Sequence, residues 1–148
     1  MKVLLLDSIR SMQNVGAIFR NCDGAGFEKI YLTGFSPTPP RGEISKTALQ
    51  SENTIDWEYY ADPQEVLWIL KNNWFKIFSI ELSQDAIDYK SLYNNTPENI
   101  CFVLWNEVKG VDEKILDISD EIVMIPMLWS KESLNVSVAA GIVMYATV

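Results

Sequence analysis

Polar residues that could do chemistry stand directly after three apolar stretches of the sequence. Glu81 follows the first, WNEVKG occupies positions 105–110 at the second, and PMLWSKESLN occupies 126–135 at the third. The chain has no histidine and only two cysteines, which excludes Ser-His-Asp hydrolysis, Cys-His proteolysis and almost every zinc site. No complete phosphate-binding or dinucleotide-binding glycine motif is present either. We therefore expect no metal, and a small-molecule site where these polar residues converge.

The apolar stretches themselves are typical of buried parallel strands. They are near-continuous runs of aliphatic and aromatic residues that alternate along the chain with segments of helical character. The predicted strands are KVLLL (2–6), KIYLT (29–33), FKIFSIEL (75–82), ICFVLW (100–105) and EIVMIPM (121–127). This alternation predicts an α/β fold with a parallel sheet and helices on both faces. Ligands of such sheets bind beyond the carboxyl ends of the strands, where the polar residues stand.

Three helices are predicted between and after these strands. Asn14 is a candidate N-cap for the first. The second is DPQEVLWILKNN (62–73), with Asp62 as its cap, and the last runs from about residue 135 to residue 147. Residues 34–53 form a long loop followed by a possible short helix, and loops of this length are usually functional or disordered.

The bulk properties indicate one domain, residues 1–148, that is long enough to bury a hydrophobic core. No apolar run reaches the roughly 18–20 residues of a membrane span, and MKVLLLD is too short for a signal peptide. We expect a cytoplasmic protein that does not bind a membrane. Buried thiols at Cys22 and Cys101 are favoured over a disulfide between them.

The net charge of −8 is unevenly distributed along the chain. Residues 1–50 carry six Lys and Arg against four acids, a net charge of +2, whereas residues 51–148 carry a net charge of −10. One interpretation is a chance fluctuation in a solvated surface. The other is that the first third of the chain holds a polyanion such as RNA.

Three segments together resemble the SpoU/TrmH branch of the SPOUT RNA methyltransferases. NVGAIFRNCDGAGF (14–27) is similar to the first motif of that family, and FVLWNEVKGV (102–111) is similar to the second. IPM (125–127) followed by SLNVSVAAG (133–141) is similar to the third. The order and spacing of the motifs agree, and the resemblance covers essentially the whole chain.

The resemblance implies an α/β sheet whose C-terminal part is tied into a trefoil knot, the SPOUT or α/β knot fold. It also implies a homodimer packed partly through the C-terminal helix, and S-adenosylmethionine as the methyl donor. The implied reaction is methyl transfer to a ribose 2′-hydroxyl of structured RNA, with tRNA favoured over rRNA. Such a hydroxyl is a poor nucleophile, so the reaction needs positioning and help with the proton.

The family's functional residues carry over position by position. The implied catalytic residues are Asn14, Arg20, Glu107, Ser133 and Asn135. The implied cofactor-binding residues are Ile80, Glu81, Leu82, Trp105, Asn106, Gly110, Ile125, Met127, Ser133 and Leu134. The candidate RNA-binding residues are Arg10, Arg20, Arg41 and Lys46. Because arginine stays protonated, Arg20 is expected to pair with an RNA phosphate and to ease deprotonation electrostatically.

Each of these residues also has a plainer interpretation. Asn14 and Asn135 could be helix N-caps. Arg20 could be a surface residue of an amphipathic helix, and Glu107 a carboxylate in a turn. The charges at 131–132 are interpreted as solvated loop charges.

Three tryptophans, Trp74, Trp105 and Trp129, stand where relatives usually have glycine. Glycine permits positive φ and lets a ligand approach the backbone closely, so an indole here could cap the cofactor pocket, stack on adenine or block the pocket. One hypothesis is that the source organism reads UGA as glycine whereas this chain was translated with tryptophan. The alternative function is a non-catalytic knotted RNA-binding or scaffolding relative with impaired cofactor binding.

Overall fold

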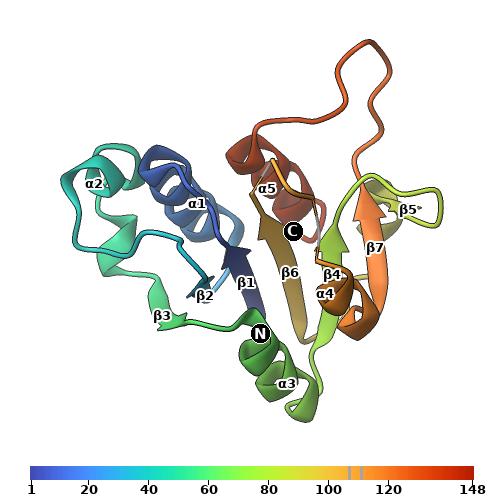
Figure 1. The fold of residues 1–148 in the computed structure, drawn as a ribbon, viewed down its shortest axis with the longest axis horizontal. Coiled ribbons are helices and arrows are strands. Elements are labelled where there is room, and N and C mark those ends of the chain that lie inside the picture. Colours follow the sequence, from blue (N-terminus) through green and yellow to red (C-terminus); the bar gives the residue numbers. More distant parts are fainter. Residues whose placement is uncertain (107, 111) are drawn as a thin grey trace.

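A parallel sheet of seven strands forms the centre of the part of the chain that the structure describes (Figure 1). The structure is a computed structural model that describes residues 1–106, 108–110 and 112–148. The strand order is β3-β2-β1-β6-β4-β7-β5, so β3 and β5 are the edges, and the neighbours all run parallel. The strands are β1 (Lys2–Asp7), β2 (Lys29–Thr33), β3 (Asp56–Tyr60), β4 (Lys76–Ile80), β5 (Ile87–Asp88), β6 (Ile100–Trp105) and β7 (Glu121–Met124).

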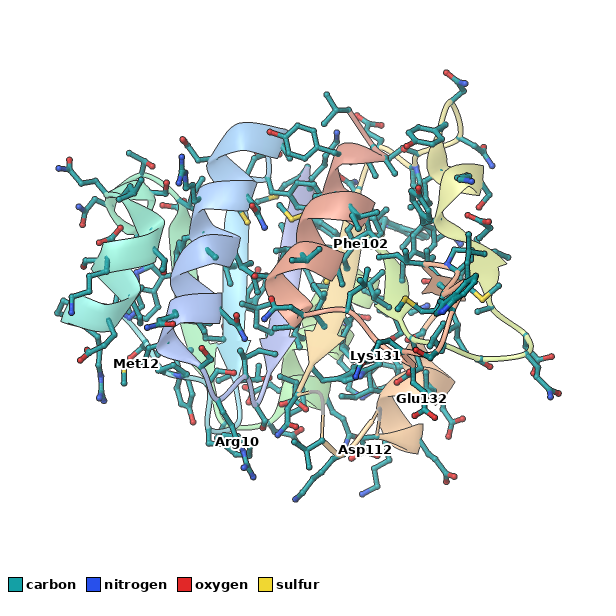
Figure 2. The ribbon with its side chains drawn as sticks, turned by 90° about the horizontal axis from the view of Figure 1, so that it is seen from above. Arg10, Met12, Phe102, Asp112, Lys131 and Glu132 are labelled. Carbon is teal, nitrogen blue, oxygen red and sulfur yellow. The ribbon has the colours of Figure 1, made fainter. Side chains whose placement is uncertain are left out.

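Helices cover both faces of this sheet, which confirms the predicted α/β fold. The α-helices are α1 (Met12–Ala25), α2 (Gly42–Ala48), α3 (Pro63–Asn72), α4 (Glu113–Ile118) and α5 (Val136–Tyr145); two short 3₁₀ turns are η1 (Ser51–Asn53) and η2 (Tyr89–Leu92). One buried apolar cluster contains residues of α1, α2 and α5, and a second contains residues of α3 and α4. Figure 2 shows α1 and α5 side by side on their face.

The five predicted strands are confirmed, with differences in their bounds. β2 and β6 have the predicted bounds, and β1 extends one residue further, to Asp7. β4 is shorter than predicted and covers Lys76–Ile80, and β7 ends at Met124, so the IPM segment belongs to a loop. Pro126 has no N–H with which to continue a ladder. The sequence did not predict the two edge strands, β3, in which Asp56 and Glu58 interrupt the apolar pattern, and the two-residue β5, and it did not predict the short helix α4.

The cap predicted for α1 was wrong by three residues. Ser11 is the N-cap, and its hydroxyl oxygen accepts a hydrogen bond of 3.2 Å from the backbone N–H of Asn14. Asn14 therefore lies in the first turn of α1, which leaves its side chain for another partner. The caps predicted for the other two helices are confirmed, because Asp62 caps α3 and Asn135 caps α5.

α1 and α2 approach each other most closely at Gly16. A Cβ atom there would overlap the carbonyl oxygen of Ile44 and the hydroxyl of Thr47. That hydroxyl also donates a 2.8 Å hydrogen bond to the carbonyl of Gln13, which joins the two helices. The glycine of the first motif is thus required by helix packing.

α1 and α3 end with the same backbone arrangement, a Schellman motif. In both, a residue with left-handed φ follows the helix, and the next N–H donates to the carbonyl five residues earlier, over 3.0 Å after α1 and 3.1 Å after α3. After α1 the left-handed residue is Gly26, with φ 70°; after α3 it is Trp74, with φ 63°. The indole of Trp74 is 87% exposed, so packing does not explain its presence there.

None of the described helices combines the length and the apolar character needed to cross a membrane. Cys22 and Cys101 are buried and free, as predicted. Burial raises the pKa of both thiols, so they stay protonated at neutral pH.

Candidate functional site

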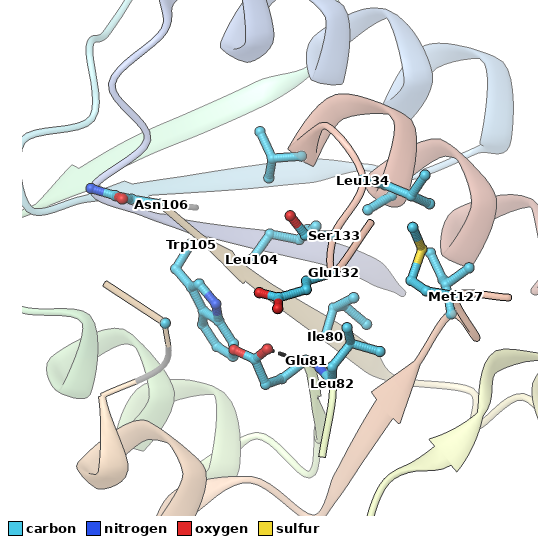
Figure 3. A pocket seen from close by; sticks show the side chains of 14 residues that line it. Ile80, Glu81, Leu82, Leu104, Trp105, Asn106, Met127, Glu132, Ser133 and Leu134 are labelled. Atoms are coloured by element: carbon cyan, nitrogen blue, oxygen red, sulfur yellow. Dashed lines mark hydrogen bonds between the residues drawn. The ribbon is translucent and has the colours of Figure 1, made fainter. Parts of the chain in front are cut away.

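A pocket opens beyond the carboxyl ends of β4, β6 and β7 (Figure 3). Every residue that the sequence assigned to cofactor binding lines it: Ile80, Glu81, Leu82, Trp105, Asn106, Gly110, Ile125, Met127, Ser133 and Leu134. The three strand exits therefore converge as predicted, at the edge of the sheet where parallel folds bind ligands.

The lining combines apolar side chains with two carboxylates. Ile80, Leu104 and Leu134 contribute apolar surface, and Glu81 and Glu132 contribute the carboxylates. Figure 3 shows both carboxylates near the Trp105 indole. Among the described lining residues there is no Lys or Arg, so the electrostatics favour a ligand that carries positive charge beside apolar groups. Within the same described part of the chain, no cluster of His, Cys, Asp or Glu could hold a metal ion.

Neither tryptophan of the cofactor loops closes the pocket. Trp105 is partly buried and forms one side of it. Trp129 is 93% exposed and is not part of the lining. The pocket stays open in the chain with its tryptophans in place.

Two asparagines join α1 to α5 beside the pocket. The side-chain amide of Asn135 donates a 3.2 Å hydrogen bond to Oδ1 of Asn14. Oδ1 of Asn135 also accepts from the N–H and the hydroxyl of Ser137, over 2.9 and 2.6 Å. Asn135 therefore caps α5, as its plainer interpretation predicted, and also binds Asn14. It lies two residues after Ser133, which lines the pocket.

Arg20 lies apart from this pocket. It is exposed on α1, six residues after Asn14, which corresponds to about 9 Å along the helix. It lines a separate hollow that Lys46 of α2 and Tyr145 of α5 also line. The structure thus brings together two of the predicted RNA-binding cations, at a distance from the predicted cofactor residues.

The remaining predicted site residues are dispersed. Arg41 is exposed directly before α2. The Arg10 guanidinium lies over the Phe35 ring, 5.7 Å from its centroid, in the neighbourhood of the β1 and β2 ends. Glu107 lies outside the described residues, so its catalytic assignment stays a prediction.

Sequence reasoning missed four lining residues, Leu104, Glu132, Val136 and Ala139. Glu132 was interpreted as a solvated loop charge; it is exposed, but it also lines the pocket. The sequence signal that could have identified Glu132 as a lining residue was its position directly before Ser133, which was assigned to the site. Val136 and Ala139 are three residues apart on α5, so helical spacing places them on one face of the helix.

The sequence model of the SpoU rRNA Methylase family matches residues 1–145 of the chain. The chain belongs to the SpoU rRNA Methylase family. This confirms the SpoU/TrmH resemblance that the three motifs indicated.

Proteins similar to this SpoU chain include two curated tRNA (guanosine(18)-2′-O)-methyltransferases. The protein from Aquifex aeolicus is 31% identical over 144 residues, which are 97% of this chain and 66% of the relative. The protein from Thermus thermophilus is 30% identical over 142 residues, which are 96% of this chain and 71% of the relative. The crystal structure of the A. aeolicus TrmH/SpoU tRNA modifying enzyme superposes with a TM-score of 0.86 at 28% identity, covering 99% of this chain and 73% of that one. This SpoU chain thus spans 66% of the Aquifex relative's length and 71% of the Thermus relative's.

Proposed function

We propose that this chain transfers a methyl group from S-adenosylmethionine to a ribose 2′-hydroxyl of structured RNA. The observation that carries the proposal is one pocket built by the second and third SpoU motifs, beside a hydrogen bond that joins the first motif to the third. The names of the two similar tRNA methyltransferases support tRNA over rRNA as the substrate.

The residues of the pocket fit S-adenosylmethionine, which supplies an electrophilic methyl group on a sulfonium cation. The apolar side chains of Ile80 and Leu134 would hold the adenine. The Glu81 carboxylate would accept hydrogen bonds from ribose hydroxyls, and the Glu132 carboxylate would favour the positive charge of the ligand. Because no described lining residue is cationic, nothing in that lining repels the sulfonium.

The chain's own residues would position the ribose hydroxyl and ease the loss of its proton. Orientation alone removes a large part of the entropic barrier to a bimolecular step. Ser133 in the pocket wall and the Asn14–Asn135 pair beside it offer the hydrogen bonds for that orientation. Arg20 lies apart from the pocket, so it would ease deprotonation through the RNA phosphate with which it pairs, and Glu107 would hold the polar groups in register.

A homodimer is part of this proposal. α5 is apolar around its whole circumference, and such a helix is normally buried, yet Val138 is 49% exposed and Tyr145 52%. A second copy packed on α5 would cover both side chains. It would also enclose the hollow of Arg20 and Lys46, which Tyr145 lines.

The proposal includes the trefoil knot and the single domain of residues 1–148 that the SpoU motifs imply. The long loop after β7, which leads to α5 and lines the pocket, supports a knotted C-terminal part (Figure 1). The free thiols support a reducing compartment such as the cytoplasm. Arg10, Arg41 and Lys46 are proposed contacts to RNA phosphates.

Two measurements test the proposal. Calorimetric titration of the folded chain with S-adenosylmethionine should detect binding, and a radiolabelled methyl group should appear in tRNA. Arg20→Ala should keep cofactor binding, since Arg20 does not line the pocket, but should lose transfer. Lys114→Ala, an exposed cation on α4, serves as the control and should keep both. A folded chain without cofactor binding would favour the scaffolding alternative, and full transfer by Arg20→Ala would refute the role of that arginine.

A further inference from the structure

A second hollow lies beside the cofactor pocket and shares a wall with it. Trp105, Asn106 and Gly110 line both, and Figure 3 shows the first two of them at the carboxyl end of β6. The other lining residues of the second hollow are Asp7, Ser8, Phe35, Lys109 and Asp112. If the proposed function holds, an RNA that brings a ribose to the cofactor pocket also passes this hollow. Its side chains are therefore placed to meet nucleotides next to the target.

Phe35 presents an aromatic ring at the second hollow. The ring is 53% exposed, and the Arg10 guanidinium lies over it, 5.7 Å from its centroid. A single exposed apolar side chain is ordinary on a protein surface, but this one lines a hollow and is paired with a cation. Aromatic rings and guanidinium planes are the surfaces on which proteins stack unpaired RNA bases.

The turn that carries Phe35 is held in place from two sides. The hydroxyl of the buried Ser36 donates to the carbonyl of Leu6 over 3.0 Å and accepts from the N–H of Ile9 over 2.9 Å. On the other side, the Tyr59 hydroxyl donates a 2.7 Å hydrogen bond to the carbonyl of the residue before Phe35. A surface that is fixed before a ligand arrives loses little conformational entropy on binding.

The charges around the second hollow offset one another. Lys109 in the lining and Arg10 over the ring are cations, whereas Asp7 and Asp112 in the lining are acids. Charges of both signs give the hollow no strong preference for an anion or for a cation. The aromatic ring is therefore the feature that selects the ligand, and a flat, neutral base suits it. The phosphate attached to that base can meet Arg10.

We propose that Phe35 and Arg10 form a stacking platform for the base of a nucleotide next to the target nucleotide in the RNA. The inference rests on the proposed function, which puts the target ribose in the adjoining pocket. Because a phenyl ring has no hydrogen-bonding group, the platform accepts every base and requires only that the base is unpaired. It thus selects the structure of the RNA around the target and not its sequence.

The test compares two fluorescein-labelled oligonucleotides, hexaadenylate and a hexamer with the same backbone but no bases. Binding to the full chain is measured by fluorescence anisotropy at one salt concentration. Phe35→Leu should weaken hexaadenylate about fivefold or more, the contribution of one stacked base, and should leave the abasic hexamer unchanged. Phe35→Trp restores a stacking ring and should bind hexaadenylate within about twofold of the parent chain.

Tyr93→Leu is the matched control, because it removes an aromatic side chain of similar exposure, 51%, that follows η2 and does not line the second hollow. It should leave the affinity for both hexamers unchanged. Far-ultraviolet circular dichroism checks that all variants are folded. The inference is overturned if hexaadenylate binds no more tightly than the abasic hexamer. It is also overturned if Phe35→Leu leaves hexaadenylate binding unchanged or weakens both hexamers equally.

A kinetic measurement connects the platform to the reaction. Phe35 does not line the cofactor pocket, so Phe35→Leu should keep the affinity for S-adenosylmethionine and the kcat of methyl transfer. Its KM for tRNA should rise about fivefold or more. A lower kcat with an unchanged KM contradicts the platform. Methyl transfer by a chain whose hexamer binding ignores Phe35 overturns this inference alone, whereas stacking on Phe35 without cofactor binding or transfer overturns the proposed function alone.

Discussion

Trp74 occupies a backbone position that glycine fits better. Its φ of 63° is left-handed, and α1 ends in the same arrangement with Gly26 at 70°. We predict that Trp74→Gly is more stable than Trp74→Ala, the reverse of the order of these two residues in the interior of a helix.

The magnitude follows from the backbone angle. The left-handed conformation costs an L-residue about 1–2 kcal/mol, and glycine's greater freedom in the unfolded chain takes back about 0.4–1 kcal/mol. Trp74→Gly should therefore exceed Trp74→Ala by about 1 kcal/mol in unfolding free energy. Both variants lose the same indole, which is 87% exposed. Its buried remainder of roughly 30 Å² contributes less than about 1 kcal/mol and cancels in the comparison.

Trp68 provides the matched control in the interior of the same helix, with its side chain 58% exposed. There glycine costs about 1 kcal/mol relative to alanine, so the order of the two variants should invert. Urea unfolding followed by far-ultraviolet circular dichroism measures all four proteins. A glycine variant less stable than the alanine variant at both positions would show that the left-handed angle does not limit stability at Trp74.

Four further predictions concern packing, acid stability, capping and the gene. Gly16→Ala should destabilise the fold by about 1–3 kcal/mol or more in urea unfolding, because the new methyl group collides with the Ile44 carbonyl. Burial raises the pKa of Asp120, but a hydrogen bond from the N–H of Ile77 and the charges of two lysines outweigh burial and lower this pKa below its ordinary value. Its stabilisation is therefore complete above the unfolded pKa of about 3.9 and is lost as the pH falls through the lower folded value. The gap in unfolding free energy to Asp120→Asn should close below about pH 4, and a gap that persists there contradicts the pairing. Asn135→Ala should cost about 0.5–2 kcal/mol of thermal stability through the lost cap of α5, and no loss would contradict that role. The codons of the three tryptophans at glycine positions should be UGA, and UGG at all three refutes the recoding hypothesis.

The central strands of the fold could be predicted because their burial on both faces makes them continuous apolar runs. β6, with five of its six residues fully buried, is the clearest case. β3 could not be predicted in the same way, because it is an edge strand and only Trp57 and Tyr60 are partly buried. The N-cap of α1 was misassigned because Ser11 and Asn14 are both capping residues, and only the backbone decides between them.

The cofactor loops could be predicted because parallel strands deliver their exits to one edge of the sheet. The separation of Arg20 from that edge could not be predicted from the sequence. It depends on how far α1 extends beyond its first turn and on which helices flank α1. The second hollow beside the cofactor pocket, lined by Asp7 and Phe35 among others, could not be predicted either. Asp7 ends an apolar run and Phe35 stands in a loop, and only the pairing of β1 with β2 brings them together.

The two edges of the sheet bear on how copies of the chain can associate. An edge strand exposes unpaired N–H and C=O groups that another chain can extend, which is a common route to aggregation. β5 is only two residues long, and β3 presents the exposed acids Asp56 and Glu58. Neither edge is a good template, because β5 is too short and β3 carries charged side chains, which natural edge strands use to resist such pairing. Association through strands is thus disfavoured at both edges of the described sheet, which agrees with the proposal that two copies meet through the apolar surface of α5.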